Sequence, residues 1–350
     1  MADRKKQIIC RGLLLAVLCY VRRNKMNLNE KKQSIFANPI IMTLVALLCC
    51  ALWGSATPAI KTGYRLLEVS GVASIMLFAG MRFFLAGILT IIIFSVGERK
   101  FLIPKKENVP KVLVLSAFQT IIQYIFFYLG LAYTSGVKGT VASGSGAFFA
   151  VLIASLVFRQ EKLTFKKISA CVIGFLGILI MNFDGLSLTG DALDLMGVGF
   201  VLLSTISSSF SSVLTKKYSA YERPVVLSGY QFAVGGLFMA IVGFAFGGRV
   251  YMGSLPGILD LIYLAFLSAI AYSLWGILLK HNTVSRVTVF NFMTPIFGVL
   301  LTLLFLPDEP SKVTPLALVI TLILTSTGII LLNYRKNPKP EVKEEEKSES

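Results

Sequence analysis

Ten long apolar segments run through this chain of 350 residues, and they constrain its fold more than any other feature. A helix needs about 20 predominantly apolar residues to cross a bilayer. Each segment is close to that length, and short polar loops separate them. We predict spans at residues 39–60, 73–95, 110–131, 138–158, 166–183, 195–215, 225–246, 257–279, 287–306 and 314–333. The predicted fold class is therefore an all-α integral membrane protein.

The second five segments read as a diverged copy of the first five. The sequence RFFLAG in the second segment aligns with QFAVGG in the seventh. Tyr124 in the third segment aligns with Tyr272 in the eighth, and an Ala-Phe pair precedes each tyrosine at the same spacing. Because five is an odd number, the second copy must cross the membrane in the opposite sense. We predict two inverted repeats, 39–183 and 195–334, an architecture typical of secondary transporters.

The formal net charge of +16 would allow nucleic-acid binding, but the positions of the basic residues favour another interpretation. They gather in alternate loops, where they include Arg99, Lys100, Lys105, Lys106, Lys111, Arg159, Lys162, Lys166, Lys167, Lys216, Lys217 and Arg223. Basic loops stay on the cytoplasmic side and attract anionic headgroups. We predict a multi-pass plasma-membrane protein with both termini cytoplasmic, membrane lipids as partners and no nucleic-acid partner.

The two ends of the chain differ from the apolar centre. Residues 1–38 are basic, and their apolar run at 8–20 is too short to span a bilayer. This run is either an interfacial helix or a stretch ahead of the true start at Met26, and we favour Met26. Residues 335–350 are highly charged and have little to bury, so we predict a disordered cytoplasmic tail.

Several kinds of chemistry lack the residues that they need. The five cysteines show no CxxC spacing and His281 is the single histidine, so we predict no metal site. The chain has no G-x-x-x-x-G-K-[ST] loop for ATP phosphates, and no predicted span carries a carboxylate near its centre. We predict no enzymatic activity and no cofactor. Facilitated diffusion, exchange and ion coupling all remain open.

Six stretches carry a resemblance to a known family. They are ALWGSATPAIKTG (51–63), RFFLAG (82–87), QYIFFYLGLAYTSGVKGTVAS (123–143), RQEKLTFKKISACVIGFLGILIMN (159–182), KHNTVSRVTVFNFMTPIFGVLLTLLF (280–305) and STGIILLN (326–333). Over about residues 39–334 the chain resembles the EamA-type branch of the drug/metabolite transporter superfamily. The resemblance implies a carrier of small metabolites whose cavity is lined by segments one, three, four, six, eight and nine. The fourth segment departs from the family pattern, because Gly144–Ala147 stand where a proline is usual.

Polar and aromatic side chains within these segments are the candidates for contact with a solute. Gln119, Gln123 and Tyr124 share one helical face of the third segment, and the sixth is rich in serine. Interhelical hydrogen bonds, worth about 0.6 kcal/mol each, are the alternative role for such groups. The predicted cavity residues are Trp53, Ser55, Gln119, Gln123, Tyr124, Ser143, Ser145, Ser208, Tyr272, Trp275, Asn291 and Thr294.

A second set of residues is predicted to shape or gate the bundle. A charge at the centre of a span costs about 2.5–3.5 kcal/mol. For Arg82 we favour a structural role over solute contact, because its aligned partner, Gln231, is neutral. Small residues permit close crossings, and prolines kink helices. The structural or gating candidates are Pro58, Arg82, Gly146, Gln231, Pro295 and Gly298; Glu161 and Glu309 are predicted to cap the helices that follow them.

These observations together predict a secondary transporter that moves a small metabolite or drug-like solute by alternating access. A nucleotide-sugar or sugar-phosphate carrier is the alternative within the same class. A membrane-embedded lipid-modifying enzyme would need clustered acid, base or metal ligands, and a receptor or scaffold would not need two inverted halves with a polar interior. The identity of the solute, the direction of transport, the coupling ion and the oligomeric state stay unassigned.

Overall fold

The computed structural model describes residues 35–134, 136–183, 192–305 and 313–334. These residues form helices joined by short turns, and they contain no strand. The predicted all-α class is confirmed. The predictions made for residues 1–34, with Met26 and the run at 8–20, and for 335–350 lie outside the described residues, as does Glu309.

The first half contributes five crossings, of which the third and fourth are composite. After η1 (Ile35–Ala37), the first two are α2 (Pro39–Leu66) and α3 (Gly71–Glu98). The third runs through η2 (Lys106–Asn108), α4 (Val109–Leu115), the π-helical η3 (Ser116–Ile122) and α5 (Gln123–Tyr133). The fourth comprises α6 (Gly136–Gly144), α7 (Gly146–Leu152) and the π-helical η4 (Ile153–Val157), and the fifth is α8 (Phe165–Met181).

The second half repeats this order. It contains α9 (Ala192–Tyr218), α10 (Pro224–Ala245), α11 (Leu255–His281), a composite crossing of α12 (Val284–Thr288), η6 (Val289–Phe292) and α13 (Met293–Phe305), and α14 (Pro315–Asn333). Nine helices in the described part of the chain are long and apolar enough to cross a membrane. With 17 residues, α8 is a tenth crossing at the lower limit of the usual range.

Local sequence signals explain where several helices begin. The side chain of Asn38 accepts a hydrogen bond from the backbone N–H of Ile40 at 2.9 Å, and Pro39 opens α2. Ser254 and Thr314 cap α11 and α14 in the same way, and each of these helices also has a proline in its first turn. Such caps satisfy backbone donors that a helix leaves free, and proline is favoured at the first position because it lacks the N–H.

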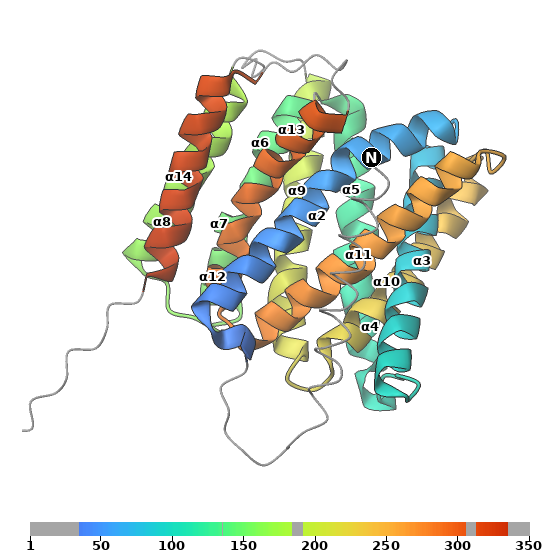
Figure 1. Cartoon of the computed structure of the whole chain (residues 1–350), viewed down its shortest axis with the longest axis horizontal. Coiled ribbons are helices and arrows are strands. Elements are labelled where there is room, and N and C mark those ends of the chain that lie inside the picture. Colours follow the sequence, from blue (N-terminus) through green and yellow to red (C-terminus); the bar gives the residue numbers. More distant parts are fainter. Residues whose placement is uncertain (1–34, 135, 184–191, 306–312, 335–350) are drawn as a thin grey trace, which may run out of the picture.

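Helix packing repeats when the two halves are exchanged (Figure 1). Two helices of the first half, α3 and α8, pack along their own counterparts, α10 and α14. The first helix of each half packs against crossings of the other half: α2 contacts α11 and α13, while α9 contacts α5, α6 and α7. Each of these contacts therefore has an equivalent contact in which the two halves are exchanged. The interior of the bundle lies between the halves rather than within either half.

The crossing of α3 and α10 brings two backbones unusually close. A Cβ atom added to Gly236 would lie 2.7 Å from the carbonyl carbon of Phe83, and one added to Gly80 would lie 2.6 Å from the Cα of Ala240. The rings of Phe83 and Phe232 stack beside this crossing at 5.1 Å. Small residues are what allow helices in a membrane to approach this closely. Helices α3 and α10 form one side of the bundle, and α8 and α14 form the opposite side (Figure 1).

Candidate functional site

The fourth crossing is interrupted near its middle and the ninth within its first half. In the fourth, α6 ends at Gly144 and α7 begins at Gly146. In the ninth, the four residues of η6 separate α12 from α13, and Pro295 follows within the first turn of α13. Discontinuous helices near the middle of a bundle are a common way of exposing polar groups to a solute. Residues beside both interruptions line the same cavity.

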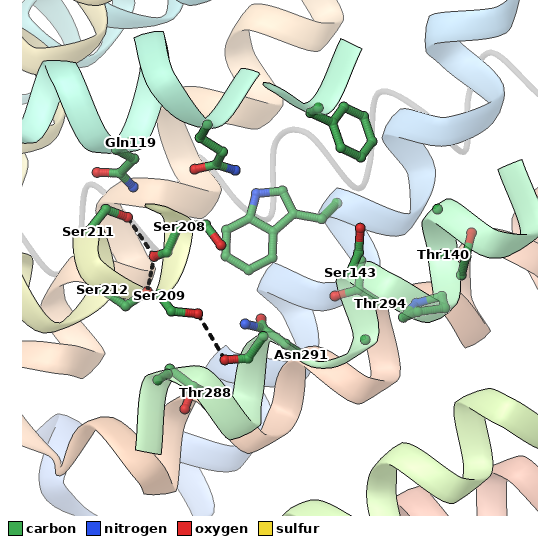
Figure 2. Close-up of a pocket in the computed structure, with 18 of the residues that line it drawn as sticks. Gln119, Thr140, Ser143, Ser208, Ser209, Ser211, Ser212, Thr288, Asn291 and Thr294 are labelled. Carbon is green, nitrogen blue, oxygen red and sulfur yellow. Dashed lines mark hydrogen bonds between the residues drawn. The ribbon is translucent and has the colours of Figure 1, made fainter. Parts of the chain in front are cut away.

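This cavity has a volume of about 570 Å³, which is within the range of small-molecule sites. Both halves contribute to it (Figure 2). Its lining consists of Trp53, Thr57, Lys61, Gln119, Gln123, Phe127, Leu131, Gly139, Thr140, Ser143, Gly144, Gly146, Ala150, Ser208, Ser209, Ser211, Ser212, Tyr272, Trp275, Thr288, Asn291, Thr294 and Pro295.

One wall of the cavity is rich in hydroxyl and amide groups. Figure 2 shows four serines of α9, at 208, 209, 211 and 212, between Gln119 on one side and Asn291 on the other. The Ser209 hydroxyl donates to the Gly146 carbonyl at 3.0 Å, which joins α9 to the interruption of the fourth crossing. Gln119 belongs to the π-helical turn η3, and such turns occur frequently at functional sites. This wall can donate and accept hydrogen bonds without a formal charge.

Aromatic rings form a second part of the wall. The Trp53 ring lies edge-on to Tyr272 at 5.1 Å and to Trp275 at 4.9 Å. The indole Nε1 of Trp53 is buried and has no hydrogen-bond partner. A buried donor without a partner is costly, so the packing of this wall leaves one polar group, the indole N–H of Trp53, unsatisfied.

The two ends of the cavity differ in exposure. We call the end of the bundle with the loops at 99–105, 158–164 and 219–223 the basic end. Toward the opposite end the lining residues Thr57, Lys61 and Leu131 are exposed. Toward the basic end, lining residues such as Ser211 and Thr288 are buried. The cavity is therefore open at the end away from the basic loops and closed at the basic end.

A buried carboxylate joins the two halves at the closed end. Glu161, whose side chain is 2% exposed, accepts hydrogen bonds from the backbone N–H of Ser285 at 3.2 Å and from the Ser285 hydroxyl, and Lys167 Nζ lies 2.7 Å from it. The prediction that Glu161 caps the next helix was wrong, because Thr164 caps α8. Glu161 instead caps the start of α12, in the other half.

Nine of the twelve predicted cavity residues are brought together in this lining, and three are not. The Ser55 hydroxyl donates to the Leu52 carbonyl at 2.8 Å and contacts the exposed Tyr263. The Tyr124 ring lies 4.5 Å from that of Phe83, and its hydroxyl contacts that of Tyr272 at 3.1 Å. The Ser145 hydroxyl bonds back to the Ala142 carbonyl at 2.6 Å. Each of the three is engaged by its own helix or a neighbouring one.

The six structural or gating candidates lie in three places. Gly146 and Pro295 line the cavity. Pro58 is buried within α2, which continues through it, and Gly298 meets α2 at Gly54. Arg82 and Gln231 lie on α3 and α10 and do not line the cavity; both are buried. The gating role of all six stays a prediction.

Sequence reasoning passed over part of the lining. Thr57, Lys61 and Thr140 had been assigned no role, although each stands where a crossing approaches the open end. In the serine run of the sixth segment, Ser208 was the one serine predicted to line the cavity, because polarity on every face of the helix left the other serines undistinguished. In the structure, Ser207 turns away and donates to the Phe118 carbonyl at 2.6 Å, whereas Ser209, Ser211 and Ser212 line the cavity.

Comparison with known proteins identifies the family. The model of the EamA-like transporter family matches residues 40–183 and again residues 195–334. The chain belongs to the EamA-like transporter family. The match of the family model to both halves agrees with the equivalent helix contacts made by the two halves. Membership of this family indicates a membrane transporter, and it does not specify the substrate.

Several similar proteins are named as uncharacterized transporters. An uncharacterized transporter of Archaeoglobus fulgidus is 27% identical over 260 residues, which cover 73% of this chain and 87% of the relative. A chloroplastic WAT1-related protein of Arabidopsis thaliana is 24% identical, with 81% of this chain and 67% of the relative covered. One crystal structure is similar in fold, with a TM-score of 0.69 at 17% identity, covering 86% of this chain and 98% of that one.

Proposed function

We propose that this member of the EamA-like family is a secondary transporter that moves a small polar solute by alternating access. The observation that carries the proposal is the cavity between the halves, which is open at one end and closed at the other by contacts between the halves. Hydroxyls, amides and aromatic rings in its wall suit a small metabolite. We further propose that the basic end is cytoplasmic and that the protein resides in the plasma membrane.

The closed end suggests how access changes. The contacts of Glu161 with Ser285 link the loop before α8 to the start of α12. Within the second half, Lys216 Nζ donates to the carbonyls of Leu279 at 3.1 Å and Asn282 at 2.5 Å, which holds the end of α9 against the end of α11. In alternating access the contacts of Glu161 with Ser285 separate while the opposite end closes. The two halves then act as rigid bodies that rock about the cavity.

Cysteine labelling tests this proposal directly. Ser143 lines the cavity, and a Ser143→Cys variant is made in a background whose five native cysteines are replaced by alanine. We expect a membrane-impermeant thiol reagent to label Cys at this position in both right-side-out and inverted vesicles. Labelling in one vesicle orientation only, under all conditions tried, would contradict alternating access.

Weakening the closed end should shift access toward the basic side. Replacing Glu161 by alanine removes the acceptor of three contacts, and hydrogen bonds to charged groups contribute about 1.5–3 kcal/mol each. A net loss of only about 1.4 kcal/mol changes the ratio of two states tenfold. We expect Ser212→Cys, which lies deep in the cavity, to be labelled about tenfold faster from the basic side.

The matched control for this variant is Glu107→Ala. Glu107 is an exposed carboxylate in η2, at the same end of the bundle. Its removal changes the net charge by the same amount without touching the contacts between the halves. Equal acceleration by both variants would show that surface charge attracts the reagent, and it would remove Glu161 from the gate.

A further inference from the structure

A short loop at the basic end presents positive charge and apolar surface together. Residues 99–106, which we call the basic strap, run from the end of α3 into η2 and read RKFLIPKK. Their four basic side chains are exposed. Two large apolar side chains are exposed among them, Phe101 at 63% and Ile103 at 67%. Apolar groups next to lysine and arginine are typical of segments that lie at a membrane interface.

The backbone of the strap is held by the bundle. Leu102 is buried; its N–H donates to the Ser95 hydroxyl at 3.0 Å, and its carbonyl accepts from the Tyr230 hydroxyl at 3.0 Å. Further along, the N–H of Lys105 donates to Glu222 Oε2 at 3.0 Å. The strap is therefore an ordered part of the surface, and its exposed side chains start from fixed positions.

The strap lies at the depth of the lipid headgroups. Helix α3 has 28 residues and is about 42 Å long at 1.5 Å per residue. At an average tilt of about 20° it spans about 40 Å, whereas the hydrocarbon core is about 30 Å thick and the bilayer with its headgroups about 40–45 Å. Arg99, with a φ of 52°, ends this helix. The strap therefore begins where the phosphates of a bilayer lie.

The positive charge of the strap exceeds the negative charge that the structure places near it. The Glu98 carboxylate forms an ion pair with Arg223. The Glu222 carboxylate accepts from the backbone N–H of Lys105. Glu107 is the acidic residue of the turn that follows the strap. Four basic side chains at this depth thus retain an excess of positive charge, which suits an anionic group.

The inverted repeat provides an internal comparison at the opposite end of the bundle. The connection between α10 and α11, residues 246–254, is the counterpart of the strap. It also exposes large apolar side chains, which include Tyr251 and Met252, but its basic residue is Arg249 alone. Apolar exposure therefore recurs in both connections, as expected at the two surfaces of a membrane, whereas the cluster of charge belongs to the strap.

We propose that the basic strap is a binding site for an anionic phospholipid in the leaflet at the basic end. The headgroup phosphate lies among the four basic side chains, and the acyl chains lie beside Phe101 and Ile103. A free phosphate or a nucleic acid would make no use of the two apolar side chains, so a lipid fits the strap better. Each basic residue near an anionic membrane contributes about fivefold in affinity, equivalent to about 1 kcal/mol. The site is separate from the transport cavity.

Native mass spectrometry of the full-length protein tests this assignment. The protein, purified in a non-ionic detergent, is titrated with phosphatidylglycerol or with phosphatidylcholine of the same acyl chains. The fraction that carries one lipid gives an apparent Kd for each. We expect phosphatidylglycerol to bind at least about tenfold more tightly, because its headgroup carries a net negative charge and that of phosphatidylcholine is neutral overall.

Two matched double variants locate the site. Lys100→Gln with Lys106→Gln removes two charges from the strap and should weaken phosphatidylglycerol binding at least about tenfold, out of about 25-fold for two full contributions. Arg159→Gln with Lys162→Gln removes two charges from exposed positions of another loop at the same end. This control should change the Kd by less than about twofold. Neither variant should alter the binding of phosphatidylcholine.

Two further measurements distinguish a lipid from a soluble phosphate. Phe101→Ser with Ile103→Ser keeps the four charges and should weaken phosphatidylglycerol binding at least about threefold, because apolar contact with the acyl chains is lost. Glycerol 3-phosphate carries the charged part of the headgroup without the chains. In hundredfold excess over the lipid it should leave phosphatidylglycerol bound.

The comparison of the two lipids on the wild-type protein decides the proposal even if a variant fails to fold. Equal Kd values for the two lipids would overturn it. Equal weakening by the two charge variants would also overturn it, since that would show diffuse attraction to the whole basic end rather than a site. Displacement by glycerol 3-phosphate would replace the lipid by a soluble phosphate. None of these readings requires transport, so one-sided labelling of Ser143→Cys would end the proposed function and leave this result intact.

Discussion

Replacing Gly236 by alanine should lower the apparent Tm of the purified protein by about 2–12 °C. The added Cβ would lie 2.7 Å from the carbonyl carbon of Phe83 and 2.9 Å from the carbonyl oxygen of Gly80. These atoms belong to the backbone of α3, so no side chain can rotate to make room and the two helices must separate. Overpacking of this kind costs about 1–3 kcal/mol or more, and each kcal/mol shifts Tm by about 2–4 °C in chains of moderate size.

Gly199 is the matched control because it is also a helical glycine, on α9, but has no atom within 4 Å of an added Cβ. Gly199→Ala should be neutral or stabilising by up to about 1 kcal/mol, as alanine is the better helix former. Fluorescence-detected size-exclusion chromatography after heating measures both variants. Equal Tm values for the two would show that the α3–α10 crossing is not as close as described.

The fold was largely predictable because membrane crossing leaves a strong and local signal. Apolar length located the ten crossings, and the aligned pairs Arg82–Gln231 and Tyr124–Tyr272 revealed the repeat. The ends were less predictable: α2 continues to Leu66, past the predicted end at 60. Hydropathy marks the apolar part of a crossing, whereas a helix continues beyond it wherever backbone hydrogen bonds are kept, here through Lys61 and Arg65.

The cavity was predictable only in part. Gln119 and Gln123 were identified because amides are rare in apolar segments and need partners or water. Tyr124 stands beside Gln123 in the chain, yet its ring packs on Phe83. Periodicity gives the face of a helix, but it does not show which neighbour that face meets. That information comes from tertiary packing.

Contacts between the halves were the least predictable feature. Glu161 and Ser285 are separated by 124 residues, and Arg82 and Ser268 by 186. The position of Glu161 just before the fifth segment suggested that it caps the helix after it, and that position carries no information about a helix start in the other half. The alignment of the repeats was the one sequence signal able to relate such distant residues, and it applies only where the contact occurs in both halves.

Placing a phenylalanine at Ser143 should reduce solute flux at least about tenfold without unfolding the protein. Ser143 lines the cavity on α6 (Figure 2), so the ring would enter space that the solute needs rather than the packed interior. Displacing a bound group by about 1 Å already costs up to about a hundredfold in a reaction that depends on position. Uptake of a metabolite panel into proteoliposomes, read by mass spectrometry, measures the loss for each solute that the wild-type protein accumulates.

The same substitution at Ser55 separates blockage of the cavity from general damage. Ser55 lies on α2, and its hydroxyl contacts Tyr263, which is 39% exposed, so the added ring faces away from the cavity. We expect Ser55→Phe to keep more than about half of the flux at equal amounts of folded protein, since surface changes usually cost little. Normal uptake by Ser143→Phe would mean that the solute takes another route, because a ring in the described cavity and an unhindered solute cannot occupy the same volume.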